Sequence, residues 1–419
     1  MPGYFFSTLG CQMNKSDSEV YAHVLDQAGY YPTTEDDADV VLLNTCAVRE
    51  ASVHKMESKI GQWVANRKKT GKPEKIGVIG CVPAIGIKEF KKKHRGVDFV
   101  LGTYSNRDEM IAAITSALEL HVQGTVALST SAVSAFVPIT FGCNCFCTYC
   151  IVPYARGRLV SRPESEIIAE TKQKIEAGAK EIILLGQNVN EYGLDKGEKD
   201  GFASLLEKVD ELEGLKRLKF ITSHPKDMDR ATLERLSKLK HLAPYFHLPI
   251  QAGSDEVLRR MARGYTKAKY LELVANIRGL FDNPAITTDI IVGFPGETRE
   301  QYDETLALLD KVRFDQVFVA MYSPRPGTPA AKMDGVCSHE ELHYRINTLL
   351  DKQREISKKL SEESVDLTFD VLVESCDDGV SRGNSGQGRL VEIDEILPVG
   401  EIVRVKIVSA SGRLKGVLV

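Results

Sequence analysis

Short apolar runs alternate with helical patterns over the first 120 residues of the chain. Three of these runs, at 4–10, 40–45 and 76–80, have the composition of buried strands in a parallel sheet, and a helical pattern follows each one. A cysteine stands at the end of each run, and each is 35 residues from the next: Cys11, Cys46 and Cys81. A βαβ unit takes about 30 residues or more, so the interval fits one strand and one helix per repeat.

The three cysteines therefore occupy equivalent places at the carboxyl ends of successive predicted strands. In an open α/β sheet these ends form one edge, where ligands bind. Two interpretations remain open at this point. The thiols converge on a shared metal site, or they are three separate buried cysteines, which are common in protein cores.

A second α/β pattern follows residues 119–135, which are small and mostly uncharged and resemble a linker. Its candidate strands alternate with helical patterns at 163–177, 202–213, 227–238, 267–280 and 299–312. Six strands in this alternation predict a parallel sheet curled into an incomplete barrel: 136–141, 182–186, 218–223, 245–251, 287–293 and 317–323. In such barrels the active site lies at the carboxyl ends of the strands.

The pattern changes again after a long polar helix predicted over 338–363. Four short alternating runs, at 369–373, 388–393, 402–407 and 415–419, predict a small antiparallel β-barrel with glycine-rich turns at Gly383, Gly386 and Gly388. We therefore expect three domains, at 1–120, 132–358 and 362–419. The fold class is α/β, with an open parallel N-terminal domain, an incomplete (β/α)6 barrel and the small C-terminal barrel.

Composition narrows the class of protein. Hydrophobic residues make up 43% of the chain and charged residues 27%, which is typical of a globular protein with a substantial core. The N-terminus lacks the pattern of a signal peptide and no stretch of about 18 apolar residues occurs, so we expect a cytoplasmic protein with no membrane span. In that reducing compartment, clustered cysteines are metal ligands or catalysts more often than disulfides.

The densest cysteine cluster has the form CxxxCxxC, with Cys143, Cys147 and Cys150 at the ligand positions and Cys145 between them. Three thiolates in one short loop suit an iron–sulfur cluster with one iron left open to a further ligand. Structural zinc is the alternative, but it usually requires a second pair of cysteines at a dozen or more residues, and none occurs here.

This loop, including Tyr149 before the last cysteine, resembles the signature of the radical S-adenosylmethionine (SAM) superfamily. Further motifs resemble the methylthiotransferases within it, and those closest in pattern are the tRNA-modifying, MiaB-type enzymes. The C-terminal barrel resembles a TRAM domain, an RNA-binding module. The motifs are Leu9–Asn14, Asn44–Arg49, Gly80-Cys81, Ser161–Pro163, Leu185–Asn190, Thr222–Pro225, His247–Ser254 and Asp289–Glu297.

The resemblance implies two [4Fe-4S] clusters, one held by Cys143, Cys147 and Cys150 and an auxiliary one held by the other cysteine triad. It implies two SAM molecules, one that methylates sulfur carried by the auxiliary cluster and one that binds at the first cluster and yields a 5′-deoxyadenosyl radical. The product would be a methylthio group on carbon 2 of N6-isopentenyladenosine beside the anticodon. Four residues are candidate SAM contacts: Tyr149, Gln187, Gln251 and Asp289. Expected partners are tRNA, an electron donor such as flavodoxin or ferredoxin, and a sulfur donor.

Two features depart from the family pattern. Cys145 is an additional thiol, which we interpret as idle because Cys145 and Cys147 are too close to serve two irons of one cube. The C-terminal barrel is acidic, with six Lys/Arg against eleven Asp/Glu over 361–419, which shifts the expected RNA contacts toward the basic stretch Arg67–Arg95. That stretch is otherwise an ordinary solvated face.

Alternative functions also stay open. One is a methylthiotransferase that acts on an aspartate of a ribosomal protein. The other is a non-catalytic iron–sulfur protein that binds RNA. His224 and His247 lie near predicted strand ends, where we expect hydrogen-bonded core positions.

Overall fold

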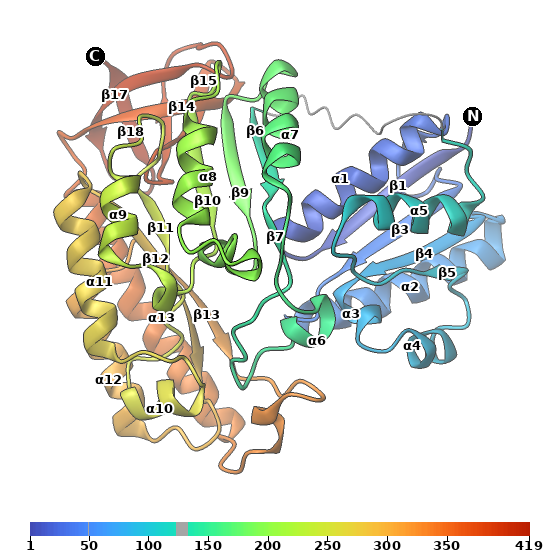
Figure 1. Ribbon diagram of the computed structural model, residues 1–419, viewed down its shortest axis with the longest axis horizontal. Helices are drawn as coiled ribbons and strands as arrows, with labels where there is room; N and C mark the ends of the chain where they lie inside the picture. Colours follow the sequence, from blue (N-terminus) through green and yellow to red (C-terminus); the bar gives the residue numbers. More distant parts are fainter. Residues whose placement is uncertain (49, 123–132) are drawn as a thin grey trace.

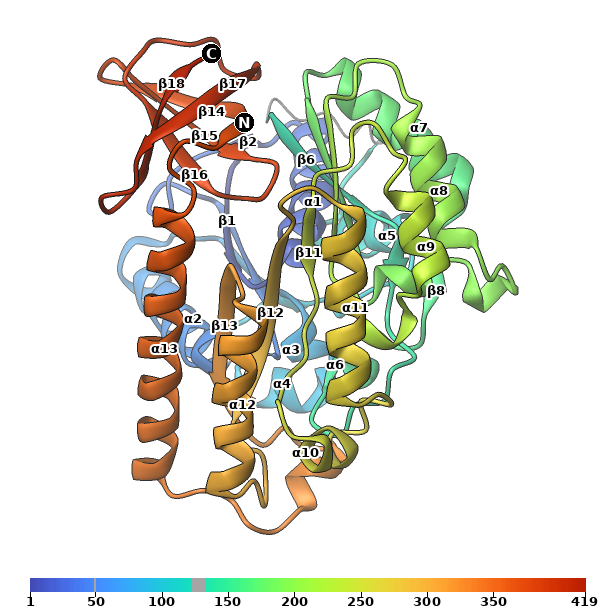
Figure 2. The ribbon, with the colours of Figure 1, turned by 90° about the vertical axis from the view of Figure 1, so that its left-hand side faces the viewer.

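The computed structural model describes residues 1–48, 50–122 and 133–419, so most of the predicted linker lies outside the described residues. The chain forms an N-terminal α/β unit, a central α/β unit and a small C-terminal barrel (Figures 1 and 2). None of the helices in the described ranges combines the length and the apolar composition of a membrane-spanning segment.

The N-terminal unit is a parallel sheet of strand order β2-β1-β3-β4-β5. The three predicted strands are its central neighbours, and the sheet has two short edge strands that the sequence pattern did not indicate. The strands are β1 (Gly3–Leu9), β2 (Tyr31–Pro32), β3 (Val40–Thr45), β4 (Lys75–Gly80) and β5 (Phe99–Val100).

Helices cover both faces of this sheet, because the fully buried strand residues point to either side. One core cluster packs under α1 (Gln12–Gln27) and α5 (Arg107–Leu118), and a second packs under α2 (Glu50–Thr70) and α4 (Ile87–Lys93). A single turn, α3 (Cys81–Ala84), follows β4 directly.

The central unit contains two three-stranded parallel sheets, ordered β10-β9-β6 and β11-β12-β13. A parallel bridge between Leu218 and Leu242 connects them, and no ladder closes β13 onto β6 among the described residues. The result is an incomplete barrel, as the sequence predicts. The strands are β6 (Ser134–Pro138), β9 (Glu181–Leu185), β10 (Arg217–Ile221), β11 (Tyr245–His247), β12 (Ala285–Val292) and β13 (Gln316–Met321).

Helices surround this barrel and the main hydrophobic core lies between them and the strands. They are α7 (Glu164–Glu176), α8 (Gly201–Asp210), α9 (Arg230–Leu236), α10 (Asp255–Arg260), α11 (Lys267–Leu280), α12 (Arg299–Val312) and α13 (His339–Glu362). Two strands of two residues each, β7 (Thr140–Phe141) and β8 (Val160–Ser161), pair in antiparallel fashion. The segment between them carries the CxxxCxxC motif and the short helix α6 (Val152–Arg156).

The C-terminal unit is a closed barrel of order β14-β15-β16-β18-β17. The predicted turn at Gly383 is wrong, because Gly383 lies within β15, whereas Gly386 and Gly388 do lie in the connection between β15 and β16. All neighbouring strands are antiparallel except β16 and β18, which pair in parallel. The strands are β14 (Thr368–Asp377), β15 (Val380–Ser385), β16 (Leu390–Ile393), β17 (Ile402–Ser409) and β18 (Leu414–Leu418).

The C-terminal barrel packs against the amino ends of the central strands. Arg217, the first residue of β10, donates to the carbonyls of Asn384 and Asp370, both at 2.8 Å. Arg389 pairs with Asp315, just before β13, at 2.8 Å. The cysteine motifs follow the carboxyl ends of their strands, so the barrel lies at the opposite end of the central unit (Figure 1).

Candidate iron–sulfur and SAM site

The sheet register brings the three N-terminal cysteines to one edge. In the ladders, Leu9 pairs with Thr45 and Thr45 pairs with Gly80, so Cys46 and Cys81 follow directly and Cys11 lies one residue further on. Cys46 and Cys81 are buried, while Cys11 is exposed at the start of α1. The structure thus confirms that the three residues close adjacent parallel strands.

Two asparagines of the sequence motifs hold this edge together. Asn14 donates to Asn44 Oδ1 at 2.8 Å and to the Thr45 carbonyl at 3.1 Å, and Asn44 donates back to the Asn14 carbonyl at 2.8 Å. Both side chains are fully buried, and Asn14 Oδ1 also accepts from Cys11. The pair therefore fixes the start of α1, and with it Cys11, against the end of β3.

Gly80 allows the end of β4 to lie close to the end of β3. Its φ is +97°, and a Cβ at this position would lie 2.5 Å from Asn44 Oδ1 and 2.6 Å from the Thr45 carbonyl. A side chain would push Cys81 away from Cys46.

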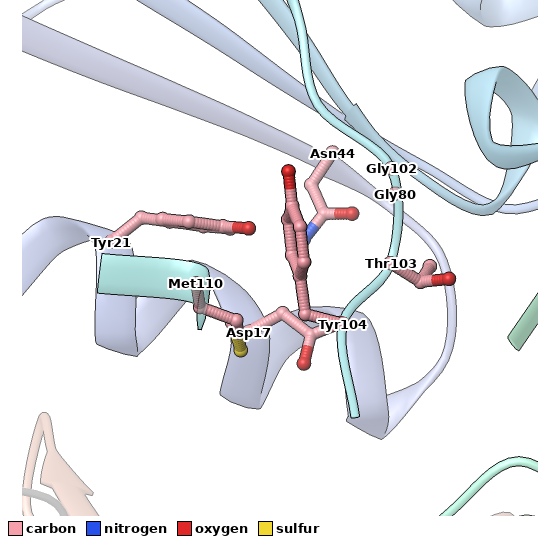
Figure 3. A pocket seen from close by; sticks show the side chains of 8 residues that line it. All are labelled: Asp17, Tyr21, Asn44, Gly80, Gly102, Thr103, Tyr104 and Met110. Carbon is pink, nitrogen blue, oxygen red and sulfur yellow. The ribbon is translucent and has the colours of Figure 1, made fainter. Parts of the chain in front are cut away.

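A narrow, tightly packed recess lies beside this edge. It is lined by Gly80, Asn44 and Asp17 together with two tyrosines, and Figure 3 shows the hydroxyl of Tyr21 pointing toward Tyr104. Burial raises the pKa of both tyrosines, so both stay protonated at neutral pH.

The CxxxCxxC loop begins at another constrained glycine. Gly142 has φ +67°, and a Cβ there would lie 2.1 Å from the Arg158 carbonyl oxygen. Cys143 and Cys147 are each only 7% exposed, and Cys150 is half-buried. Burial raises the pKa of Cys150 to about 12. A metal ion bound at this sulfur would lower the pKa of the thiol and stabilise the thiolate.

Two buried arginines donate N–H groups to candidate ligand sulfurs, and neither was anticipated from the sequence. Arg156 Nε donates to Cys81 Sγ and Arg263 Nη1 donates to Cys147 Sγ, both at 3.3 Å. A guanidinium N–H donates a stronger hydrogen bond to a thiolate than to a neutral thiol, so these contacts fit metal-bound cysteines better than free ones. The sulfur-only donor sets, the burial of four of the six thiols and these hydrogen bonds are consistent with iron–sulfur clusters at both places.

The two sites adjoin each other. Cys81 packs in one apolar cluster with Ile151 and Ala155, and Ile151 is the residue after Cys150. Thr103, in the N-terminal unit, donates to the Ala155 carbonyl. The segment that carries the CxxxCxxC motif therefore packs against the edge that carries Cys81, and α3 and α6 lie next to each other (Figure 1).

Cys145 is not isolated in the structure. Its thiol donates to Glu191 Oε1 at 3.4 Å, and Asp227 and Asn188 lie at 4.0 and 3.7 Å. Its hydrogen bond with Cys143, and then its burial, raise the pKa of the Cys145 thiol. Metal-binding atoms of Cys143, Cys145 and Glu191 lie within 4.8 Å of one another, as do those of Cys145, His224 and Asp227.

The candidate SAM contacts meet the expectation of strand-end positions only in part. Gln187 follows the end of β9 by two residues and Gln251 follows the end of β11 by four, but Asp289 lies within β12. Gln251 and Asp289 are joined by their backbones, because Gln251 N donates to the Asp289 carbonyl at 2.9 Å. Asp289 Oδ2 lies 3.5 Å from His247 Nε2. Gln187 Oε1 is buried and has no hydrogen-bond partner among the described residues, and the ring of Tyr149 packs against the main core.

Both histidines are buried and lie within hydrogen-bond distance of a polar group at Nδ1, but His224 Nε2 has no hydrogen-bond partner among the described residues. His224 Nδ1 accepts from the backbone of Lys226 at 3.2 Å, and His247 Nδ1 lies 3.0 Å from Thr287 Oγ1. Burial lowers the pKa of His224 to about 2, so its ring is neutral.

Comparison with known proteins agrees with this geometry. Residues 137–309 match the model of the radical SAM superfamily, and residues 3–102 match that of the uncharacterized protein family UPF0004. A curated relative from Clostridium botulinum (strain Hall), named tRNA-2-methylthio-N(6)-dimethylallyladenosine synthase, is 41% identical over 97% of this chain and 95% of its own. A relative of the same name from Carboxydothermus hydrogenoformans is 39% identical over 99% of both chains.

Among solved structures, a radical SAM methyltransferase from Kitasatospora setae, TsrM with cobalamin and a [4Fe-4S] cluster bound, aligns with a TM-score of 0.56. The identity is 13%, over 79% of this chain and 77% of that one, so the similarity is one of fold.

Proposed function

This chain belongs to the family of tRNA-2-methylthio-N(6)-dimethylallyladenosine synthases, and on that premise we propose how its residues share the reaction. The enzyme is a radical SAM methylthiotransferase that modifies carbon 2 of N6-isopentenyladenosine in tRNA. Relatives about 40% identical along the whole chain carry the tRNA name, which favours this substrate over a ribosomal protein.

We propose that Cys143, Cys147 and Cys150 bind the SAM-cleaving [4Fe-4S] cluster. A second [4Fe-4S] cluster would lie between the thiols of the three N-terminal strands, Cys11, Cys46 and Cys81. The observation that carries this assignment is that Cys81 shares an apolar cluster with Ile151 and accepts a hydrogen bond from Arg156, which makes the two cysteine triads neighbours. When bound, the clusters and SAM supply the radical and the sulfur, chemistry that no side chain can perform.

The residues around the sites would position these groups. Gln187 and Gln251 offer polar atoms beyond the ends of β9 and β11, and Asp289 of β12 lies beside Gln251. SAM would lie near these residues, with Tyr149 in the ligand loop. The unpartnered Gln187 oxygen supports a contact with a bound donor, since buried polar atoms rarely stay unsatisfied.

RNA contacts would come from the N-terminal unit more than from the C-terminal barrel. All six cationic residues of the barrel have a carboxylate within 4.0 Å: Arg382, Arg389, Arg404, Lys406, Arg413 and Lys415. In contrast Lys88, Lys91 and Lys92, which we name the α4 lysines, are exposed and have no ion-pair partner among the described residues. They lie on α4, which contacts α3, the turn that begins at Cys81, so we propose that they bind phosphates of the anticodon stem-loop beside the auxiliary cluster.

The remaining partners follow from the chemistry. Reductive SAM cleavage needs a one-electron donor of low potential, such as flavodoxin or ferredoxin, and turnover needs a sulfur donor. With tRNA as the substrate, we propose that the enzyme acts in the cytoplasm.

Metal analysis and turnover test this assignment. Protein reconstituted without oxygen should contain about eight irons and about eight acid-labile sulfides per chain, which corresponds to two cubes. With SAM and a strong reductant it should release 5′-deoxyadenosine, and tRNA from cells lacking it should lose methylthiolated adenosine. Absence of 5′-deoxyadenosine from protein that contains the SAM cluster would exclude the radical enzyme.

A further inference from the structure

Two buried guanidinium groups lie against the two proposed clusters, one at each. Arg156 has a side chain only 5% exposed and Arg263 is 4% exposed. Each donates to a single candidate ligand, Arg156 to Cys81 and Arg263 to Cys147. Desolvating a guanidinium is costly, so such placement requires partners that compensate for the loss of water.

The partners of the two arginines differ in charge. Arg156 Nη2 donates to Asp17 Oδ2 at 2.8 Å, so a carboxylate balances its charge. Arg263 donates to the Tyr265 hydroxyl at 3.2 Å and to the Pro249 carbonyl, both neutral. No carboxylate lies within ion-pair distance of Arg263 in the part of the chain that the structure describes, so Cys147 faces an unbalanced positive charge.

These contacts have an electronic consequence. Hydrogen bonds to cluster sulfurs and nearby positive charge both favour the reduced, more negative state, and so raise the reduction potential. Dissolved ions screen the effect of an exposed charge on a cluster, but they screen the effect of a buried charge much less.

We propose that Arg156 and Arg263 are positioning residues that set the reduction potentials of the two clusters separately. Arg156 acts on the auxiliary cluster through Cys81, mainly by its hydrogen bond. Arg263 acts on the SAM cluster through Cys147, by its hydrogen bond and its net charge. This inference rests on the proposed cluster assignment.

Arg156 has a second role in the same proposal. It lies six residues after Cys150, yet its guanidinium binds Asp17 of α1 and Cys81 after β4. It therefore fastens the ligand loop of the SAM cluster to the edge that carries the auxiliary cluster. Radical formation and sulfur transfer need a fixed separation between the two sites, and this contact would maintain it.

The test is a redox titration of the full-length reconstituted enzyme, in which EPR spectroscopy measures the amount of each reduced cluster at each potential. Added SAM identifies the signal of the cluster that binds it. In Arg263→Met, the ratio of reduced to oxidised SAM cluster at a fixed potential should fall at least tenfold, which is about 59 mV for one electron. The auxiliary signal should not move. In Arg156→Met, only the auxiliary signal should shift in the same direction.

Asp17→Asn keeps the shape of the side chain, and it should shift the potential of the auxiliary cluster in the direction opposite to Arg156→Met. It leaves the Arg156 charge unbalanced beside Cys81, so the auxiliary potential should rise. This variant keeps the proposal testable if a methionine variant fails to fold, which circular dichroism would reveal.

The outcomes separate the two hypotheses. Wild-type enzyme with about four irons would overturn the cluster assignment, and this inference with it. About eight irons with potentials that stay unchanged in the variants would overturn the inference alone. So would a shift of both clusters by either methionine variant, or a lower auxiliary potential in Asp17→Asn.

Discussion

Replacing Glu170 by glutamine tests the buried ion network between the N-terminal and central units. Glu170 of α7 accepts from Arg107 of α5, and it pairs with Arg162 and Lys174 at 2.7 and 3.2 Å. Burial alone would raise the pKa of Glu170, but the three cations outweigh burial and lower it to about 2. The substitution keeps the shape of the side chain and removes its charge.

The magnitude follows from this pKa. A carboxyl group held near 2 in the folded state, against about 4.3 when unfolded, stabilises the protein by about 3 kcal/mol at neutral pH. Burial lowers the pKa of Arg107, so part of the gain is offset by desolvation of the cations. The remaining positive charges in Glu170→Gln lose their partner, for which losses of about 3–5 kcal/mol are typical. We therefore expect destabilisation of about 3 kcal/mol.

Urea denaturation at pH 7 measures the effect. Trp63, the single tryptophan, is buried in the N-terminal unit and reports its unfolding by fluorescence. Glu164→Gln is the matched control, because Glu164 lies on the same helix in an exposed pair with Lys208 and should cost less than about 1 kcal/mol.

The pH dependence has a defined sign. The folded-state pKa is lowered, so the stabilisation is present above the unfolded pKa and disappears as pH falls from about 4.3 to about 2. The difference between wild type and Glu170→Gln should shrink over this range. Equal urea midpoints for Glu170→Gln and Glu164→Gln at pH 7, or a difference that persists at pH 2, would refute the reasoning.

Three further predictions concern the proposed sites. Cys145→Ala should retain about eight irons and its radical activity, because the Cys145 thiol is hydrogen-bonded to Glu191 and is not an iron ligand. Cys147→Ala, as the comparison, should retain about four irons. Loss of iron from Cys145→Ala would make Cys145 a ligand. Gly142→Ala should lower the iron content to about four, since its Cβ meets the Arg158 carbonyl at 2.1 Å, and normal iron loading would contradict this. Replacing the α4 lysines by glutamine should reduce the slope of log tRNA affinity against log salt concentration by about one for each phosphate contact that is lost. The same change at Arg404 and Arg413 should leave this slope unchanged. The reverse result would assign RNA binding to the C-terminal barrel.

The sequence pattern predicts the architecture well where elements are long or buried. The helices at 267–280 and 299–312 agree with α11 and α12, and the three N-terminal cysteines follow strands as expected. It fails where composition hides the strand. β15 contains Ser, Gly and Asn, which are typical of turns, and the closed barrel supplies the pairing that those residues lack on their own.

The positions of the cysteines were predictable, but their surroundings were not. Arg156 and Cys81 are 75 residues apart, Arg263 and Cys147 are 116 apart, and Cys145 and Glu191 are 46 apart. Contacts over such separations depend on how the units pack together. The one available signal was an arginine shortly after the ligand loop, and it does not reveal the partner.

The two cysteine triads differ in how their geometry is encoded. Cys143, Cys147 and Cys150 lie within eight residues, so a short loop can wrap around a cluster with little help from the rest of the chain. Cys11, Cys46 and Cys81 come from three strands, and their spacing exists only once β1, β3 and β4 have paired in register. The auxiliary site is thus a product of tertiary structure, and the chain must fold around it before its three thiols can chelate anything together.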